Sequence, residues 1–223
     1  MNFEELMSQR YSARSFQSRP VAAETIKKMF ALAQHTPSWC NTQPWHAWVT
    51  MTPQITENLR VSLMDHIVGQ GAMLKPDEPF PPRYIEPYRQ RRKECGVALY
   101  QSIGIRKEDK PASMRQMLEN FNFFGAPHVA FIFCHKMFGF YGGVDCGLYI
   151  HALLLAAENF GLRATAQGAL ASYPQFIRDY WGIDDSLRMI CGISFGYADE
   201  EHSINTFRTN RAPLEESVTW IED

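Results

Sequence analysis

The sequence lacks several features that would assign it to a well-known class. No G-x-G-x-x-G follows an expected strand, so a Rossmann-type nicotinamide site is not expected. Its longest wholly apolar run, residues 152–157, is far too short to span a bilayer. Net charge is only −2, which gives no field favouring nucleic acid or an anionic membrane. We therefore expect neither nucleic acid nor a membrane as partner.

Cysteine is sparse and irregularly placed. The five cysteines form no C-x-x-C pair, which favours free thiols in a reducing compartment. The first residues, Met-Asn-Phe-Glu-Glu, show neither a basic region nor an apolar one, so no secretory signal is expected. Both observations predict a cytoplasmic protein.

Length and hydrophobic pattern predict one domain over residues 1–223, with a helical excursion at about 69–125. The pattern predicts helices at 23–34, 53–68, 84–103, 110–124, 144–160 and 172–180, and strands at 47–51, 128–134, 163–167 and 188–197. Residues 200–223 are expected to form an extended arm. The order indicates an α+β class with a small central sheet, or a mixed α/β class as the alternative. The 144–160 helix is apolar on nearly every side, so part of its cover is expected to come from a partner subunit.

A short basic segment near the N-terminus has the pattern of an anion site. Arg10, Ser12 and Arg14 alternate, and alternate residues of an extended backbone point to the same side. Two forked guanidinium groups and a hydroxyl suit a phosphate monoester. Read alone, the triplet is more often part of a solvated surface than an anion site.

Three further segments carry groups that suit a flat ligand. The loop at 36–45 combines two prolines, two tryptophans and two amides, which offer apolar planes and hydrogen-bonding edges. Gln167-Gly168 follows an expected strand, where glycine lets the backbone approach a ligand closely. Arg208 and Arg211 place a cationic pair on the C-terminal arm. Each of these alone is more often an ordinary loop, turn or solvated arm.

Taken together, the motifs resemble one family. Arg-x-Ser-x-Arg, then Pro-Ser-x-x-Asn-x-Gln-Pro-Trp, Gly-Ala-Pro, Gln-Gly and a late Arg-x-Pro occur in the order typical of nitroreductases, from Arg10 to Pro213. The resemblance implies a three-layer sandwich with a small mixed or antiparallel sheet. It also implies a homodimer whose C-terminal arms are exchanged, with FMN bound at the interface.

The resemblance also implies which residues bind the cofactor. Arg10, Ser12, Arg14 and Arg211 would hold the phosphate and ribityl side, and the loop would come from the other subunit. The implied cofactor-binding set is Arg10, Tyr11, Ser12, Arg14, Pro37, Ser38, Trp39, Asn41, Gln43, Gln167, Gly168 and Arg211. The chain departs from the pattern at Thr209, where some members carry a lysine. Arg115 and Asn120 are open candidates for the residue that meets the pyrimidine edge of the flavin.

The implied activity is transfer of hydride from NAD(P)H through FMN to a nitroaromatic or quinone-type acceptor in a ping-pong cycle. No protein nucleophile, catalytic residue or metal is required, because the cofactor carries the redox chemistry. Dehalogenation, ene reduction or dehydrogenation on the same scaffold is the alternative, and a flavin binder without turnover remains open.

Two other patterns compete weakly. Gly192-Ile193-Ser194-Phe195-Gly196 matches the G-x-S-x-G of serine hydrolases, but little helical pattern follows it and too few residues remain for the partners. Cys146 and His151 do not have zinc-ligand spacing, and His151 is expected to be a core histidine.

Overall fold

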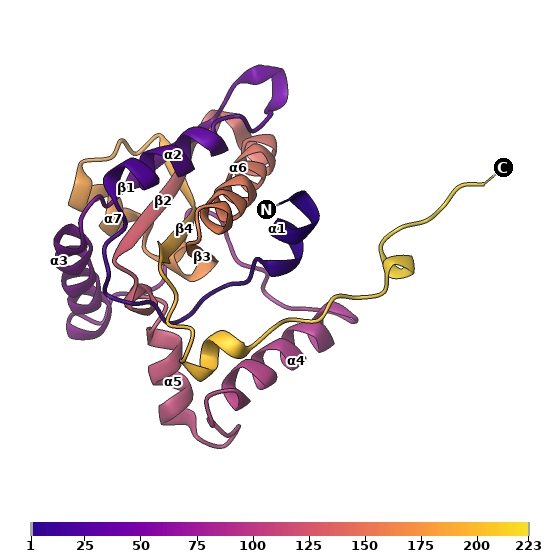
Figure 1. The fold of residues 1–223 in the computed structure, drawn as a ribbon. Coiled ribbons are helices and arrows are strands. Elements are labelled where there is room, and N and C mark those ends of the chain that lie inside the picture. Colours follow the sequence, from indigo (N-terminus) through magenta and orange to yellow (C-terminus); the bar gives the residue numbers. More distant parts are fainter. Residues whose placement is uncertain (1, 223) are drawn as a thin grey trace.

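A four-stranded antiparallel sheet forms the centre of the molecule (Figure 1). The structure is a computed structural model that describes residues 2–222. The strands are β1 (Trp45–Val49), β2 (His128–His135), β3 (Arg163–Gln167) and β4 (Leu187–Gly196), in the order β1-β2-β4-β3. All three pairings are antiparallel. The expected α+β class is confirmed, and the sheet is antiparallel rather than mixed.

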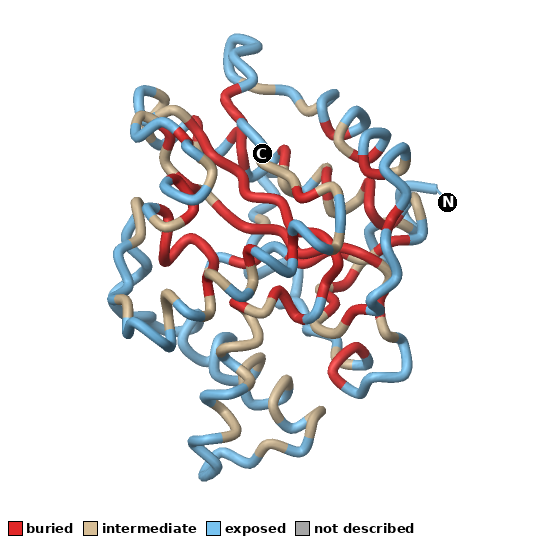
Figure 2. Tube along the Cα trace, turned by 90° about the vertical axis from the view of Figure 1, so that its left-hand side faces the viewer, coloured by how far each residue is buried: buried red, intermediate tan, exposed pale blue. Residues whose placement is uncertain are grey.

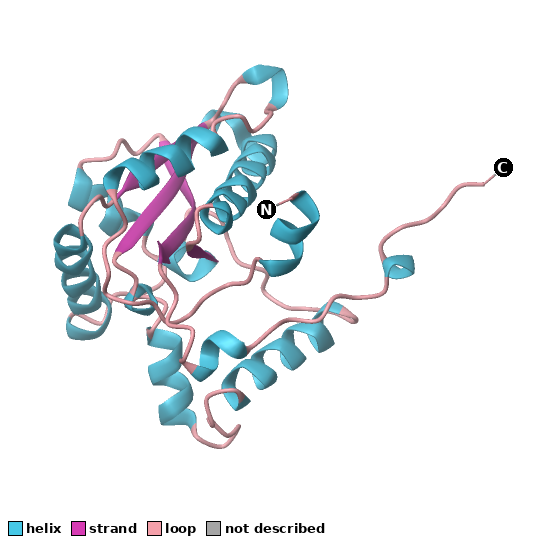
Figure 3. Cartoon of the chain, viewed as in Figure 1, coloured by secondary structure: helices cyan, strands magenta, loops and turns pink. Residues whose placement is uncertain are grey.

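Strand β2 divides the core into two layers because its side chains alternate. Val129, Phe131 and Phe133 pack on one face of the sheet, whereas Ala130, Ile132 and Cys134 pack on the other. Helices α3 (Pro53–Met64) and α7 (Pro174–Trp181) cover the first face. Helices α2 (Ala23–Ala33) and α6 (Gly139–Asn159) cover the second, so three layers result (Figure 3).

Several helix ends follow local rules that the sequence displays. The Thr52 side chain accepts a hydrogen bond from the Ile55 N–H, and Pro53 occupies the first turn of α3. Gly182 ends α7 in the left-handed conformation at φ 64°. Other boundaries differ from expectation. Strand β1 begins at Trp45 rather than 47, and α7 begins at Pro174 with no cap from Ser172.

Helix α6 begins at Gly139 rather than at 144. Its extra first turn is rich in glycine, which hides the helical period in the sequence. By length and composition, 136–159 passes the test for a membrane-spanning helix. It nevertheless packs on the sheet, where Cys146, Tyr149 and Leu153 are buried.

The excursion carries helices α4 (Tyr88–Gln101) and α5 (Lys110–Leu118), neither of which has a buried residue. Figure 2 shows this exposed segment below the buried core. Both helices are shorter than predicted. The chain leaves α5 because Phe123 and Phe124 adopt positive φ and bury their rings in the core.

The N-terminal helix α1 (Phe3–Gln9) was not expected from the pattern. Its signal is a capping box: the Asn2 side chain accepts from the Glu5 N–H, and the Glu5 side chain accepts from the Asn2 N–H. After β4 the chain makes a short helical turn at Ser203–Thr206. It then runs as an extended arm past α4 (Figure 1).

Candidate functional site

The segments 14–16 and 198–205, which lie toward the two ends of the chain, are joined beside the sheet. The Asn205 Oδ1 atom accepts from the Arg14 N–H at 2.8 Å, and the Asn205 Nδ2 atom donates to the Ser15 and Asp199 carbonyl oxygens, each at 2.8 Å. Phe16 pairs with Ala198 in an isolated antiparallel bridge. The segment before α2 is therefore held along the chain that leaves β4.

A basic cavity opens where these ends meet. Its volume is about 430 Å³, and it is lined by Met7, Ser8, Arg10, Tyr11, Ser12, Arg14, Phe207, Arg208, Thr209 and Arg211. Tyr11 and Ala13 are buried, whereas the alternate residues Arg10, Ser12 and Arg14 are part-exposed. The structure thus brings the N-terminal triplet and the two arm arginines to one place. We call this cavity the arginine pocket.

The arginine pocket has an excess of positive charge: no carboxylate lines it, although buried Glu158 interacts electrostatically with Arg10 and Arg208. In residues 2–222, none of its four arginines forms an ion pair. The buried Arg10 Nε has no hydrogen-bond partner. Burial lowers the pKa of Arg14, because the charged guanidinium loses hydration there. Arg211 bonds to Thr209 Oγ1 at 2.7 Å, and Arg208 bonds to backbone carbonyl oxygens. A bound dianion would supply the missing partner, so these residues fit a phosphate group.

Tyr11 supports the pocket from beneath. Its hydroxyl donates to Glu200 Oε2 at 2.9 Å, and burial, followed by this bond, raises its pKa. The guanidinium carbon of Arg208 lies 3.7 Å from the ring centroid, and that of Arg163 lies 5.1 Å from it. Arg208 is thus oriented by an aromatic face. It was not in the implied cofactor-binding set. The available signal was the cationic pair that Arg208 forms with Arg211 on the arm.

The purple loop at 36–45 lies at the top of Figure 1, away from the segment that follows α1. Within one chain, the structure does not bring Pro37, Ser38, Trp39, Asn41 or Gln43 to the arginine pocket.

Its backbone is held in an unusual conformation. Cys40, Asn41 and Gln43 have positive φ values of 49°, 56° and 46°. Ser38 Oγ accepts from the Gln43 N–H at 2.9 Å, and the Asp145 carboxylate accepts from the Trp39 N–H at 3.2 Å. The Asn41 and Gln43 side chains are left exposed. Strain of this kind clusters at ligand-binding positions.

Gln167 and Gly168 lie where β3 ends. The Gln167 side chain is buried and fully used: its Nε2 donates to the Asn120 carbonyl at 2.9 Å, and its Oε1 accepts from Ser194 Oγ. Only the backbone here can face a ligand. A Cβ added at exposed Gly168 would lie 4.0 Å from Phe80 Cε1, which places that aromatic ring beside the open backbone.

The start of the excursion is fixed to the core by a buried ion pair. Arg178 donates to both Asp77 oxygens at 2.7 and 2.9 Å, and Asp77 also accepts from the Met189 N–H at 2.8 Å. Burial alone would raise the pKa of Asp77, but these bonds outweigh it and lower the pKa. The clamp holds the segment that carries Phe80.

The competing patterns do not form sites. Ser194 is buried within β4, and the strand continues through Gly196 without the sharp turn into a helix that a nucleophile elbow needs. His151 is exposed, not a core histidine as predicted. Across the described part of the chain, no cluster of three His, Cys, Asp or Glu side chains is arranged to hold a metal.

Comparison with known proteins agrees with this geometry. The model of the nitroreductase family matches residues 7–197. Nitroreductase NfnB of Mycolicibacterium smegmatis is 32% identical over 97% of this chain and 92% of its own length. A 4-nitrobenzoate reductase of Nocardioides sp. is 30% identical over 99% of this chain and 90% of its own.

Solved structures show the same relationship. The FMN- and NADPH-dependent nitroreductase NfnB from sphigopyxis sp. strain HMH superposes with a TM-score of 0.94, at 30% identity and full coverage of both chains. The FMN-dependent NfnB from Mycobacterium smegmatis, solved in complex with NADPH, gives 0.92 at 31% identity over 98% of this chain and 97% of its own. The chain therefore belongs to the nitroreductase family.

Proposed function

We propose that this protein is an FMN-dependent oxidoreductase that uses NADPH to reduce the nitro group of aromatic compounds, with quinones as further acceptors. The observation that carries the proposal is the arginine pocket, to which the segments after α1 and after β4 both contribute and whose four arginines form no ion pair within residues 2–222. Relatives with about the same length are named nitroreductases and 4-nitrobenzoate reductases.

The residues of the pocket have distinct tasks in this proposal. Arg10, Arg208 and Arg211 hold the phosphate of FMN, and Ser12 faces the ribityl chain. Arg14, which also lines a neighbouring cavity of about 660 Å³ with Arg115, extends the positive field toward the ring. When bound, FMN supplies the hydride acceptor and donor chemistry. Gly168 leaves the backbone open to the ring, and Phe80 covers one side of the space for the acceptor.

We further propose a homodimer in which each subunit completes the site of the other. Helix α6 exposes an apolar stripe of four residues: Phe140 (78%), Tyr141 (54%), Val144 (43%) and Leu148 (49%). Such a stripe favours burial against a second copy. The strained loop at 36–45 is bonded to this helix through Asp145. Dimerisation through α6 would carry Ser38, Asn41 and Gln43 to the partner's flavin, and the arm beyond Arg211 would cross to the partner.

Purification of the protein tests the proposal directly. We expect a yellow protein whose released chromophore is FMN, bleached by NADPH in the absence of oxygen and restored by a nitroaromatic. Arg14→Ala should weaken FMN retention. A colourless protein that takes up no FMN from solution, or a bound flavin that NADPH does not bleach, would contradict the proposal.

A further inference from the structure

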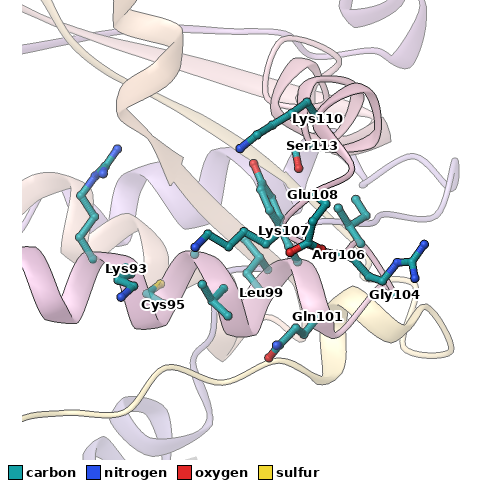
Figure 4. Close-up of a pocket in the computed structure, with 15 residues that line it drawn as sticks. Lys93, Cys95, Leu99, Gln101, Gly104, Arg106, Lys107, Glu108, Lys110 and Ser113 are labelled. Atoms are coloured by element: carbon teal, nitrogen blue, oxygen red, sulfur yellow. The ribbon is translucent and has the colours of Figure 1, made fainter.

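A second basic cavity lies between α4 and the start of α5 (Figure 4). Its volume is about 860 Å³. It is lined by the five cationic residues Arg92, Lys93, Arg106, Lys107 and Lys110, with Glu108 as its one carboxylate. The whole chain has a net charge of −2, so this concentration of positive charge is local. We call this cavity the α4–α5 groove.

Of the cations of the groove, Arg92 lies 5.1 Å from the ring centroid of Tyr84. Among residues 2–222, none of the five forms an ion pair, whereas the nearby Arg89 and Arg91 pair with Glu86 and Glu216. Figure 4 shows Lys107 and Lys110 pointing the same way across the groove, while Arg106 points away from it. Like charges brought together without a counterion repel one another, and a polyanion relieves that repulsion.

The floor of the groove is apolar and partly aromatic. Leu99, Tyr100 and Ile105 line it and are half-buried. An aromatic face and aliphatic side chains below a cationic rim suit a nucleoside that carries phosphate, better than they suit a free inorganic anion.

The groove adjoins the arginine pocket through a third cavity. Ile105 lines both the groove and the 660 Å³ cavity next to it, and Arg14 lines both that cavity and the arginine pocket. An extended dinucleotide that approaches the flavin along these cavities would have its far end at the groove.

We propose that the α4–α5 groove binds the adenosine 2′-phosphate end of NADPH and makes the protein prefer NADPH over NADH. The proposal rests on the proposed function. Tyr100 lies against the nucleoside, and Lys107 and Lys110 bind the 2′-phosphate. Helices α4 and α5 of the excursion have no buried residue. In this proposal they determine which nicotinamide nucleotide the protein uses.

Calorimetry with 2′,5′-ADP tests the groove without turnover. This nucleotide carries the 2′-phosphate of NADPH but no nicotinamide, and 5′-AMP is the matched ligand without that phosphate. We expect the FMN-loaded protein to bind 2′,5′-ADP about tenfold or more tightly than 5′-AMP. The double variant Lys107→Gln/Lys110→Gln should lose most of that difference. Lys27→Gln/Lys28→Gln removes the same charge from the exposed face of α2 and should keep it.

Kinetics give the second readout. In Lys107→Gln/Lys110→Gln, the ratio of kcat/KM for NADPH to that for NADH should fall about tenfold, and it should stay unchanged in the α2 control. Equal binding of 2′,5′-ADP and 5′-AMP to the unaltered protein would overturn the proposal, as would an unchanged ratio in the groove variant. The proposal would also be wrong if the two substitutions weakened the binding of 4-nitrobenzoate rather than that of 2′,5′-ADP. Failure of the proposed function is separate, since it shows as absence of FMN or of bleaching by either nucleotide.

Discussion

The guanidinium carbon of Arg208 lies 3.7 Å from the ring centroid of Tyr11, whose hydroxyl donates to Glu200. This stack joins a residue of the C-terminal arm to the segment just after α1. An aromatic face contributes about 0.5–2 kcal/mol to a cation above it. Its main effect here is to fix the orientation of Arg208 toward the arginine pocket.

Removal of the Arg208 charge should weaken FMN binding. We expect Arg208→Gln to raise the Kd for FMN about ten- to hundredfold, because a charged hydrogen bond to phosphate is lost. Tyr11→Leu should raise it less, and Tyr11→Phe, which keeps the ring, least. Arg19→Gln is the control, since Arg19 stacks on Tyr197 at 4.1 Å outside the pocket. Quenching of flavin fluorescence on titration measures each Kd. Equal Kd values for FMN in Arg208→Gln and Arg19→Gln would show that Arg208 does not bind the cofactor.

The apolar stripe of α6 should control the oligomeric state. Val144→Glu or Leu148→Glu places a charge in the proposed interface and should shift the protein to monomer at micromolar concentration. Val61 lies on α3 with 60% of its surface exposed, so Val61→Glu should leave the oligomeric state unchanged. Light scattering after size-exclusion chromatography measures the mass. The proposed interface is wrong if the stripe variants keep the mass of the unaltered protein and that mass is a dimer's.

The Asp77–Arg178 pair should be needed for stability. Asp77→Ala leaves a guanidinium with 6% of its side chain exposed and should lower the free energy of unfolding by about 3 kcal/mol. Arg89→Ala breaks an exposed pair with Glu86 and should cost less than about 1 kcal/mol. Urea unfolding measures both. Similar losses in the free energy of unfolding of the two variants would show that burial does not strengthen the Asp77–Arg178 pair.

His128 should make stability depend on pH. Its Nε2 accepts from the Val21 N–H at 3.0 Å and its Nδ1 lies 3.0 Å from the Thr50 carbonyl oxygen, so the neutral ring bonded to both is the form that fits. Burial lowers its pKa below the ordinary 6.5, opposed by the Thr50 bond.

The unfolded chain therefore binds the proton more readily than the folded one. The contribution of neutral His128 to the free energy of unfolding is fully present above about pH 6.5. It is lost as the pH falls toward the lowered pKa of the folded state. Urea unfolding from about pH 7.5 to pH 5 should show a decline in the unaltered protein that is shallower in His128→Gln. Parallel pH profiles would rule out this histidine as the source.

Local sequence determined more of the fold than of the site. Strand β2 is visible as a nearly continuous apolar run, because both of its faces are buried between two layers. The α7 stop at Gly182 and the Thr52-Pro53 start of α3 are equally local. Helix α1 was missed although its capping box is in the sequence, and α6 began early because glycine obscured its period.

The site depended on contacts between distant segments. The alternation of Arg10, Ser12 and Arg14 put them on one side, but only the folded chain, tied through Asn205, placed Arg208 and Arg211 opposite them. The sequence did not show whether the Gln167 side chain would be free to face a ligand. In the folded chain it is hydrogen-bonded to Asn120 and Ser194.

Sequence periodicity thus decided which way side chains face along one element. Which elements come together, and which charges are left without a partner, was decided only by packing of the whole chain.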